Sequence, residues 1–411
     1  MKDRAKQSYV LIIALCWLAY TVAYIGRLNF NAYIEPIRNQ LGASKTELGL
    51  VGSFFFFSYG AGQLFHGIMS KKYNPRYSVA VALLGSAAVN FSMSLCTQAA
   101  TMKYLWLLNG FFQAILWSSV IKMLAERLPE EMLPKAIVAM STPPALGTFL
   151  AYGMAALLSS GGVSYKVVFY IPAVLLLFTG ALWFALTGGA RVSKEQAAAL
   201  PHTEPGQKKV RLSPAFIFGA VLLLLAAVAN GFIKDGVTTW TPSILKERYA
   251  MEESFSILIT VILPLIAVGG SWFSTVLHKR WENTSALNAG LYLAEAAVLL
   301  LVLLSARSSS LKSPVLLIVL FSISAMLMSA VNNIISSIIP LYMRDKMPSG
   351  LLAGVLDTFC YVGSSLSTGL LGYISDNGSW NSVFLCLFIF GASAFAVCAV
   401  SVVTGKKEGK V

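Results

Sequence analysis

Apolar runs about as long as a bilayer is thick dominate this sequence. A membrane-spanning helix needs roughly 20 predominantly apolar residues. Twelve runs of about that length lie at 9–33, 47–69, 77–98, 104–126, 136–159, 166–187, 214–239, 254–277, 284–305, 313–341, 349–374 and 380–404. The 411 residues are 56% hydrophobic and 12% charged, which excludes a soluble globular protein. We predict an all-α membrane protein with 12 transmembrane helices.

The basic residues are unequally divided between the two sides of these runs. Of 31 lysines and arginines, 20 lie in the termini and the loops on one side, 8 in the loops on the other and 3 within runs. Cytoplasmic segments carry the excess of such residues. We therefore expect a multi-pass protein of the cell (inner or plasma) membrane with both termini in the cytoplasm. The net charge of +13 is then explained by the excess of basic residues in the cytoplasmic segments, and we expect no nucleic-acid partner.

A polar stretch divides the twelve runs into two sets of six. It contains Pro201, Pro205 and several basic residues, a composition typical of a linker. We predict an N-terminal six-helix bundle over 1–187, a cytoplasmic linker over 188–213 and a C-terminal six-helix bundle over 214–411. The two bundles would be pseudo-symmetric, as in secondary transporters built from internal repeats.

The first run contains an arginine that needs a polar partner. Arginine at the centre of a spanning helix costs roughly 2.5–3.5 kcal/mol. Tyr20, Tyr24, Arg27 and Asn31 are spaced so that a helix places them on one face. A polar face on an apolar helix lies against a bundle interior or a water-filled cavity. The face predicts a cavity that receives an anion; the alternative is an arginine that pairs with an internal carboxylate.

The seventh run repeats this arrangement. Arg27 precedes Pro36 by nine residues, and Lys234 precedes Pro242 by eight. Pseudo-symmetric halves would bring the two cations face to face across one central cavity. The alternative is coincidence with local ion pairing. Neighbours in a helix do not face each other, so we expect Lys234 not to pair with Asp235.

Further polar residues mark the second, fourth and eleventh runs. Gln63 and His66 share a helix face in the second run, and Trp117 follows in the fourth. Asp357 and Tyr361 share a face in the eleventh run. We expect Asp357 to be the internal counter-charge of Arg27 or Lys234, and we assign His66 to the same group of coupling and charge-pairing residues.

The sequence contains no arrangement typical of an enzyme or a metal site. No nucleophile in a cleft, metal-ligand cluster or phosphate-binding loop is visible, and five cysteines lie in or beside apolar runs. We predict that the chain is not an enzyme and needs no cofactor or metal.

Several short motifs resemble one transporter family over the whole chain. Within the major facilitator superfamily, the sequence is most similar to the organophosphate:phosphate antiporters, the type of the glycerol-3-phosphate and hexose-6-phosphate transporters. The matching segments are Tyr20…Tyr24…Arg27-x-Asn29-Phe30, Asn74-Pro75-Arg76, Asn109-Gly-x-x-Gln113-x-x-x-Trp117, Trp240-Thr-Pro242-x-x-Leu-Lys246-Glu247 and Tyr361.

The resemblance implies the major facilitator fold and a site for the substrate. Two arginines of that family hold the phosphate; the first matches Arg27, and Lys234 stands in the second position. The family also has a lysine in the second span and a histidine in the fifth, which correspond roughly to Gln63 and to the region of Pro144 in this chain. This cavity therefore has fewer cationic donors than the family's pattern. The resemblance also implies that Tyr20, Tyr24, Trp117 and Tyr361 line the cavity.

Two charged residues have no settled role in this prediction. Lys122 either extends to the membrane surface or contacts substrate. The resemblance implies that the ninth run usually faces lipid, and Glu295 within it either extends to the membrane surface or pairs with another residue.

We therefore predict a secondary active transporter that carries a small organic anion, an organophosphate or a carboxylate, by alternating access and exchange. Substrate-binding residues would be Arg27, Lys234, Tyr20, Tyr24, Asn31, Gln63, Trp117 and Tyr361. The alternatives are a proton-coupled symporter or exporter of another organic solute, in which Asp357 titrates, and a transporter-like sensor of sugar phosphate. The expected partners are the substrate and the lipid bilayer, with the protein acting as a monomer. The pattern leaves the substrate's identity and the direction of transport open.

Overall fold

The computed structural model describes residues 2–69, 72–188, 214–281, 283–307, 313–343 and 349–407. The first half consists of helices α1 (Lys2–Ala32), α2 (Ile34–Leu41), α3 (Lys45–Met69), α4 (Pro75–Leu95), α5 (Ala99–Ala114), α6 (Leu116–Arg127), α7 (Leu133–Ala139), α8 (Thr142–Ser160) and α9 (Tyr165–Leu186). The second half consists of α11 (Pro214–Tyr249), α12 (Glu253–Thr260), α13 (Ile262–Arg280), α14 (Thr284–Arg307), α15 (Pro314–Asn333), the π-helix η2 (Ile334–Ile338), α16 (Ile339–Tyr342), α17 (Ser349–Asn377) and α18 (Trp380–Lys407).

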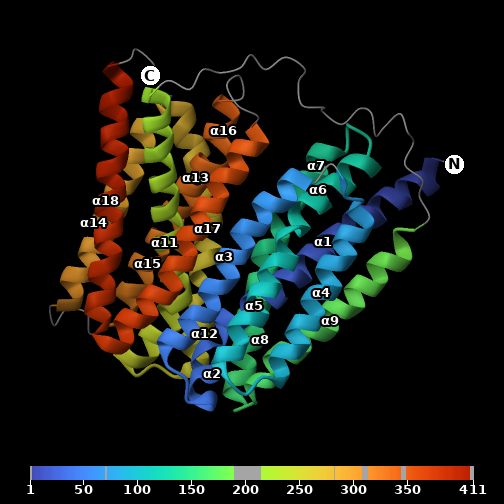
Figure 1. Ribbon diagram of the computed structural model, residues 1–411, viewed down its shortest axis with the longest axis horizontal. Coiled ribbons are helices and arrows are strands. Elements are labelled where there is room, and N and C mark those ends of the chain that lie inside the picture. The colour runs from blue at the N-terminus through green and yellow to red at the C-terminus, as the bar shows by residue number, and fades with distance from the viewer. Residues whose placement is uncertain are drawn as a thin grey trace.

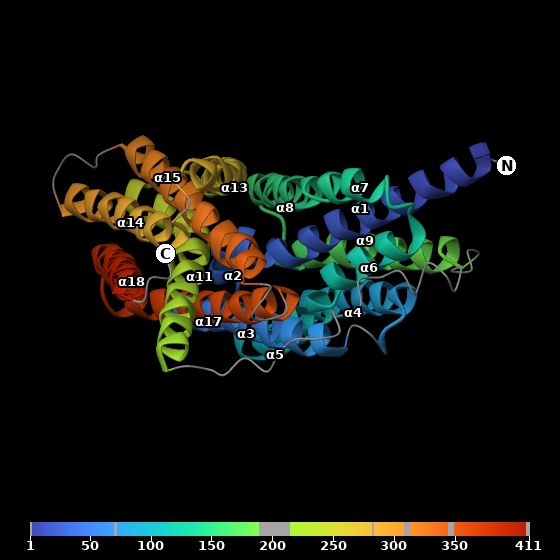
Figure 2. The same cartoon turned by 90° about the horizontal axis from the view of Figure 1, so that it is seen from above.

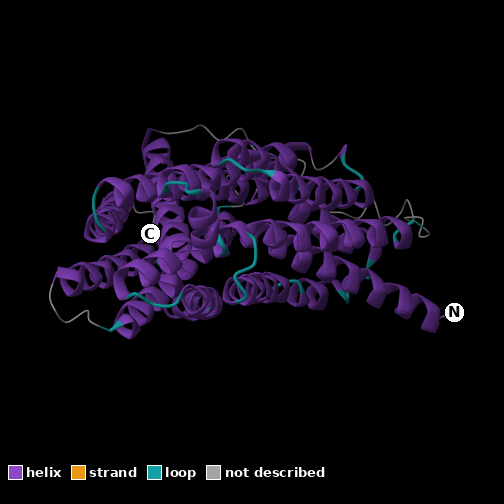
Figure 3. Cartoon of the chain, turned by 90° about the horizontal axis from the view of Figure 1, so that it is seen from below, coloured by secondary structure: helices purple, strands orange, loops and turns teal. Residues whose placement is uncertain are grey.

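The prediction of a helical membrane protein is confirmed. Among the described residues, eleven helical stretches are long and apolar enough to cross a membrane. The remaining predicted span corresponds to α8, whose first turn contains Pro143 and Pro144, and which packs along α1 and α12. Figure 3 shows helices joined by loops throughout the described part of the chain.

The helices form two bundles that lie side by side (Figures 1 and 2). One bundle contains α1–α9 and the other α11–α18, and the two chain ends lie at the same end of the molecule (Figure 1). We call this the termini end and the opposite end, where α2 lies, the α2 end. The expected linker falls almost wholly on residues 189–213, which lie outside the described residues.

A buried network of asparagine side chains joins the helices of the first bundle. Asn29 Nδ2 donates to Asn90 Oδ1 over 2.9 Å and to the Val168 carbonyl oxygen over 3.0 Å. Asn90 and Asn109 both donate to the Gly26 carbonyl oxygen, over 3.1 and 3.0 Å. Because hydrocarbon offers no hydrogen bonds, such side chains stabilise contacts between spanning helices. The network fixes the residues on either side of Arg27.

The two bundles touch along α3 and α17, where small residues allow close approach. A Cβ atom on Gly60 would lie 2.8 Å from Tyr361 Cβ. Ser53 Oγ donates to the Ser365 carbonyl oxygen over 2.6 Å, and Ser365 Oγ donates to the Ser53 carbonyl oxygen over 2.9 Å. Small residues let spanning helices pack backbone against backbone.

Charged residues close the α2 end between the bundles. Glu247 of α11 lies 3.2 Å from Arg38 Nη2 and 2.8 Å from Lys45 Nζ of the other bundle. Asp376 of α17 accepts from the Thr46 backbone N–H over 2.7 Å. Among the described residues, hydrogen bonds and ion pairs between the bundles extend from here to Gly60 and Thr358. The bundles are therefore joined at the α2 end and through the middle of the molecule.

Of the two alternatives for Glu295, the structure shows a contact with another helix. Glu295 is fully buried between α14 and α15, where its Oε1 accepts from Ser324 Oγ over 2.5 Å. A charged or polar side chain inside a membrane domain normally turns toward other helices, which explains the inward position. Lys122 donates to the Tyr73 carbonyl oxygen over 2.7 Å within the first bundle.

Candidate functional site

Arg27 lies among aromatic rings at the contact between the bundles. Its guanidinium carbon is 4.3 Å from the ring centroid of Tyr59 and 5.4 Å from that of Tyr24. Its Nη2 lies 3.4 Å from Tyr361 Oη, an oxygen contributed by the other bundle. Within the described part of the chain, no carboxylate lies within ion-pair distance of Arg27. The rings stabilise the cation by cation–π attraction and leave its charge unneutralised.

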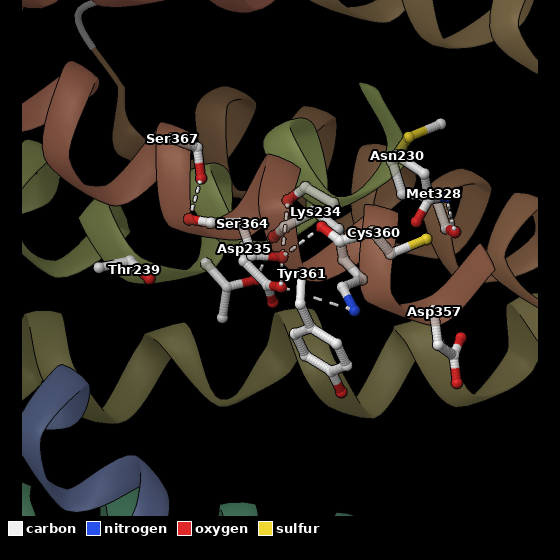
Figure 4. Close-up of polar contacts among 12 residues, drawn as sticks. Asn230, Lys234, Asp235, Thr239, Met328, Asp357, Cys360, Tyr361, Ser364 and Ser367 are labelled. Atoms are coloured by element: carbon white, nitrogen blue, oxygen red, sulfur yellow. Dashed lines mark hydrogen bonds and ion pairs between the residues drawn. The ribbon is translucent and has the colours of Figure 1, made fainter. Parts of the chain in front are cut away.

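Lys234 has an acidic partner beside it. Its Nζ lies 3.6 Å from Asp235 Oδ2, so the expectation that these two residues do not pair is wrong. Ser364 Oγ donates to the same Asp235 oxygen over 2.5 Å and holds the carboxylate in place. The long lysine side chain then turns back toward it. Figure 4 shows this group where α11 meets α17.

Tyr361 connects the two cations. The Lys234 Nζ lies 5.9 Å from its ring centroid, and the Arg27 guanidinium carbon lies 5.8 Å from the same centroid. Arg27 belongs to α1 of the first bundle, and Lys234 belongs to α11 of the second. The structure thus places the two residues on opposite bundles around one tyrosine.

Asp357 accepts a hydrogen bond from Ser336, a residue of the π-helix η2. Lys234, Tyr361 and Asp357 project toward the same side of α11 and α17 (Figure 4). The structure pairs Lys234 with Asp235, and Asp357 contacts a serine hydroxyl. Single π-helical turns occur frequently at functional sites. The residue pattern does not reveal this segment, because Ile334–Ile338 reads as a continuation of the tenth run.

The remaining aromatic candidates form a group beside Arg27. The ring centroid of Tyr20 lies 5.3 Å from that of Tyr24 and 5.0 Å from that of Trp117. Tyr59 and Phe55 complete the ring of aromatics around the guanidinium, and we did not predict either as a site residue. The spacing held a signal for Tyr59, since it lies one helical turn before Gln63.

The polar candidates Asn31, Gln63 and His66 lie in three different surroundings. Asn31 Nδ2 donates to Thr239 Oγ1 over 3.3 Å and so joins the two bundles. Gln63 Oε1 is buried and has no hydrogen-bond partner among the described residues. His66 Nε2 lies 3.3 Å from the Phe111 carbonyl oxygen, inside the first bundle. No contact in the described structure connects His66 to Arg27.

The chain belongs to the Major Facilitator Superfamily, whose family model matches residues 16–349. The described residues contain no group of three metal-ligating side chains. The family match and a full-length transporter relative identify the chain as a transporter and not an enzyme.

Two transporters resemble the chain over nearly its whole length. The chain is 26% identical to the glycerol-3-phosphate transporter of Bacillus subtilis, over 96% of this chain and 92% of the relative. It is 23% identical to the hexuronate transporter of the same organism, over 95% and 93% of the two chains. The resemblance to the organophosphate:phosphate antiporter type is thereby confirmed.

A solved structure shares the fold. The inward-facing, occupied crystal structure of a bacterial homologue of the human lysosomal transporter Spinster superposes with a TM-score of 0.75. The superposition covers 97% of both chains at 13% identity, which establishes the shared fold alone.

Proposed function

We propose that this chain carries a small organic anion across the membrane by alternating access, and that the anion binds between Arg27 and Lys234. The observation that carries the proposal is the guanidinium of Arg27, which lies between the bundles without an acidic partner among the described residues. An unneutralised cation inside a membrane domain attracts an anion strongly, because the surrounding dielectric constant is low.

The charges around the centre favour an anion of low charge. Asp235 already neutralises Lys234, so a substrate must compete with that carboxylate for the ammonium group. Lysine also lacks the two-pronged geometry with which arginine holds a phosphate. Arg27 then supplies the main attraction for the substrate. Lys234 supplies a weaker attraction, because its ammonium group is shared with Asp235. A carboxylate or a singly charged phosphate ester suits this arrangement.

The unneutralised arginine also favours exchange. A cation that has lost both water and substrate is costly when the cavity closes around it. A bound anion removes this cost, so the loaded protein interconverts between its two states faster than the empty one. The relatives named for glycerol-3-phosphate and hexuronate transport suggest an organophosphate or a sugar carboxylate as substrate.

Asp357 supports a second candidate, proton-coupled transport. Its carboxylate shares the central region with Lys234 and Tyr361 (Figure 4) and contacts the π-helix through Ser336. Protonation would neutralise the Asp357 carboxylate, which accepts the hydrogen bond from the Ser336 hydroxyl. The binding of a proton would thereby be coupled to the geometry of the π-helix. This candidate requires flux driven by a pH gradient with no counter-substrate.

Flux into proteoliposomes distinguishes the candidates. Vesicles preloaded with phosphate, glycerol-3-phosphate or a hexuronate should take up labelled external anion, and empty vesicles should not. Arg27→Ala should abolish this uptake, whereas the exposed control Lys135→Gln should retain it. Uptake that needs only a pH gradient and is lost in Asp357→Asn would replace exchange with proton coupling. Binding without flux under either condition would indicate a sensor.

A further inference from the structure

A polar cavity lies in the first bundle, away from Arg27 and Lys234. It has a volume of about 230 Å³ and is bounded by the start of α4, the end of α6 and the residues that follow α9. Its lining includes Asn74, Arg76, Glu126, Arg127 and Thr187. A cavity needs roughly 10–15 Å³ of this kind of volume to hold one water molecule, so this cavity has room for a larger polar group.

The two arginines of this cavity have hydrogen-bond donors that nothing in the described structure satisfies. Arg76 Nε is buried without a partner, although Arg76 Nη2 donates to the Phe184 carbonyl oxygen over 2.8 Å. Nε and Nη1 of Arg127 are both buried without a partner. Buried donors are almost always hydrogen-bonded in folded proteins. Three orphaned guanidinium nitrogens at one cavity therefore call for an acceptor.

The charge balance of the lining favours an anionic acceptor. Two guanidinium groups face one carboxylate, that of Glu126, which itself lies 3.9 Å from Lys122 Nζ. Guanidinium groups match the oxygens of phosphate better than any other side chain does. The helix start contributes little, because Asn74 already accepts from the Arg76 backbone N–H over 3.0 Å.

Two exposed aromatic rings lie beside this cavity. The Arg76 guanidinium carbon is 4.5 Å from the ring centroid of Phe184 and 5.7 Å from that of Tyr77, and both rings are exposed. Tyrosine and tryptophan gather at the boundary between membrane and water, and Tyr77 suits such a position. Basic pockets between helices on the cytoplasmic side bind anionic headgroups.

We propose that Arg76 and Arg127 form a binding site for a phosphate group, supplied by the headgroup of an anionic phospholipid or by free phosphate. The site shares no lining residue with the central site around Arg27 and Lys234, and does not depend on the transported substrate. A phosphate here would satisfy the orphaned donors and join α4, α6 and α9 at the termini end of the first bundle.

Thermal unfolding of the purified full chain tests this site. The background is Arg27→Gln, so that phosphate bound at the central site does not contribute. The probes are inorganic phosphate, short-chain phosphatidylglycerol and short-chain phosphatidylcholine, each titrated in neutral detergent. A ligand that binds the folded state raises the melting temperature, and its stabilising free energy grows as the logarithm of one plus the ratio of free ligand to its dissociation constant.

Adding Arg127→Gln should weaken the effective phosphate or phosphatidylglycerol binding by about tenfold or more, since a hydrogen bond to a charged group is lost. Arg127 is the preferred position because it makes no hydrogen bond that the described fold needs. Lys135→Gln, an exposed cation near the same end, is the matched control and should change nothing. Arg127→Lys keeps the charge and should recover part of the binding.

The ligand arms identify the source of the phosphate. Stabilisation by phosphatidylglycerol and not by phosphatidylcholine or phosphate assigns a lipid headgroup, and stabilisation by inorganic phosphate assigns the free anion. The proposal is overturned if neither anion stabilises the Arg27→Gln protein. It is also overturned if Arg127→Gln and Lys135→Gln respond equally.

Discussion

Neutralising Glu247 should open the α2 end of the molecule. Glu247 of α11 holds Arg38 and Lys45 of the other bundle and accepts from Trp380 Nε1 of its own bundle over 3.0 Å. The two cross-bundle ion pairs must break when the bundles separate at this end. Glu247→Gln removes the carboxylate charge and leaves the side-chain volume nearly unchanged.

The size of the effect follows from the exposure of the groups. The Glu247 side chain is 25% exposed, so solvent screens its ion pairs. Partly exposed pairs contribute up to about 1 kcal/mol each, and the two together about 1–2 kcal/mol. That free energy corresponds to a shift of roughly 5- to 30-fold in the ratio of closed to open molecules.

Double electron–electron resonance between two spin labels measures the ratio of closed to open molecules. Labels on the exposed residues Ser160 and Asn377 report the separation of the bundles at the α2 end. The matched control is Glu252→Gln, because Glu252 is exposed and contacts Ser254 within its own bundle over 2.5 Å. The reasoning is refuted if the distance distribution of Glu247→Gln equals that of the control.

Three further substitutions test the packing and the site. Asn29→Ala removes hydrogen bonds to Asn90 and to a backbone carbonyl, and should lower stability by about 1–2 kcal/mol in a detergent unfolding titration; an unchanged midpoint would contradict the network's role. Gly231→Val places a side chain against the Cys360 carbonyl, and should prevent α11 from packing on α17, seen as loss of monodisperse protein in size-exclusion chromatography. Lys234→Arg restores the two-pronged donor and should favour phosphate esters over carboxylates about tenfold in competition binding; equal preference would argue against contact between this residue and the anion.

The helical architecture could be predicted because spanning helices obey simple requirements of length and hydropathy. Each run had to cover the bilayer and to satisfy its backbone internally. The interruptions inside helices were harder to foresee, because they depend on contacts with other helices. The π-helix Ile334–Ile338 lies within a run long enough to read as one continuous span, and its hydrogen bond to Asp357 depends on the tertiary arrangement.

The central site was predictable in part for a similar reason. Arg27 and Lys234 stood out because cations are costly in apolar helices. The expectation that Lys234 and Asp235 do not pair was wrong. The spacing rule for helices considers neither the hydrogen bond by which Ser364 fixes Asp235 nor how far a lysine side chain can bend. The position of Glu295 stayed open because the hydropathy of a run does not say which face meets a neighbouring helix.

The central claim is most directly tested by thermal stabilisation of the purified protein across a panel of phosphate, organophosphates, carboxylates and amino acids. A ligand present at 100 times its dissociation constant should contribute about 2.7 kcal/mol to the folded state. We predict that one or more organic anions raise the melting temperature, and that Arg27→Ala abolishes the increase while Lys135→Gln preserves it. The account is contradicted if no anion stabilises the protein, or if Arg27→Ala is stabilised as strongly as the unmodified chain.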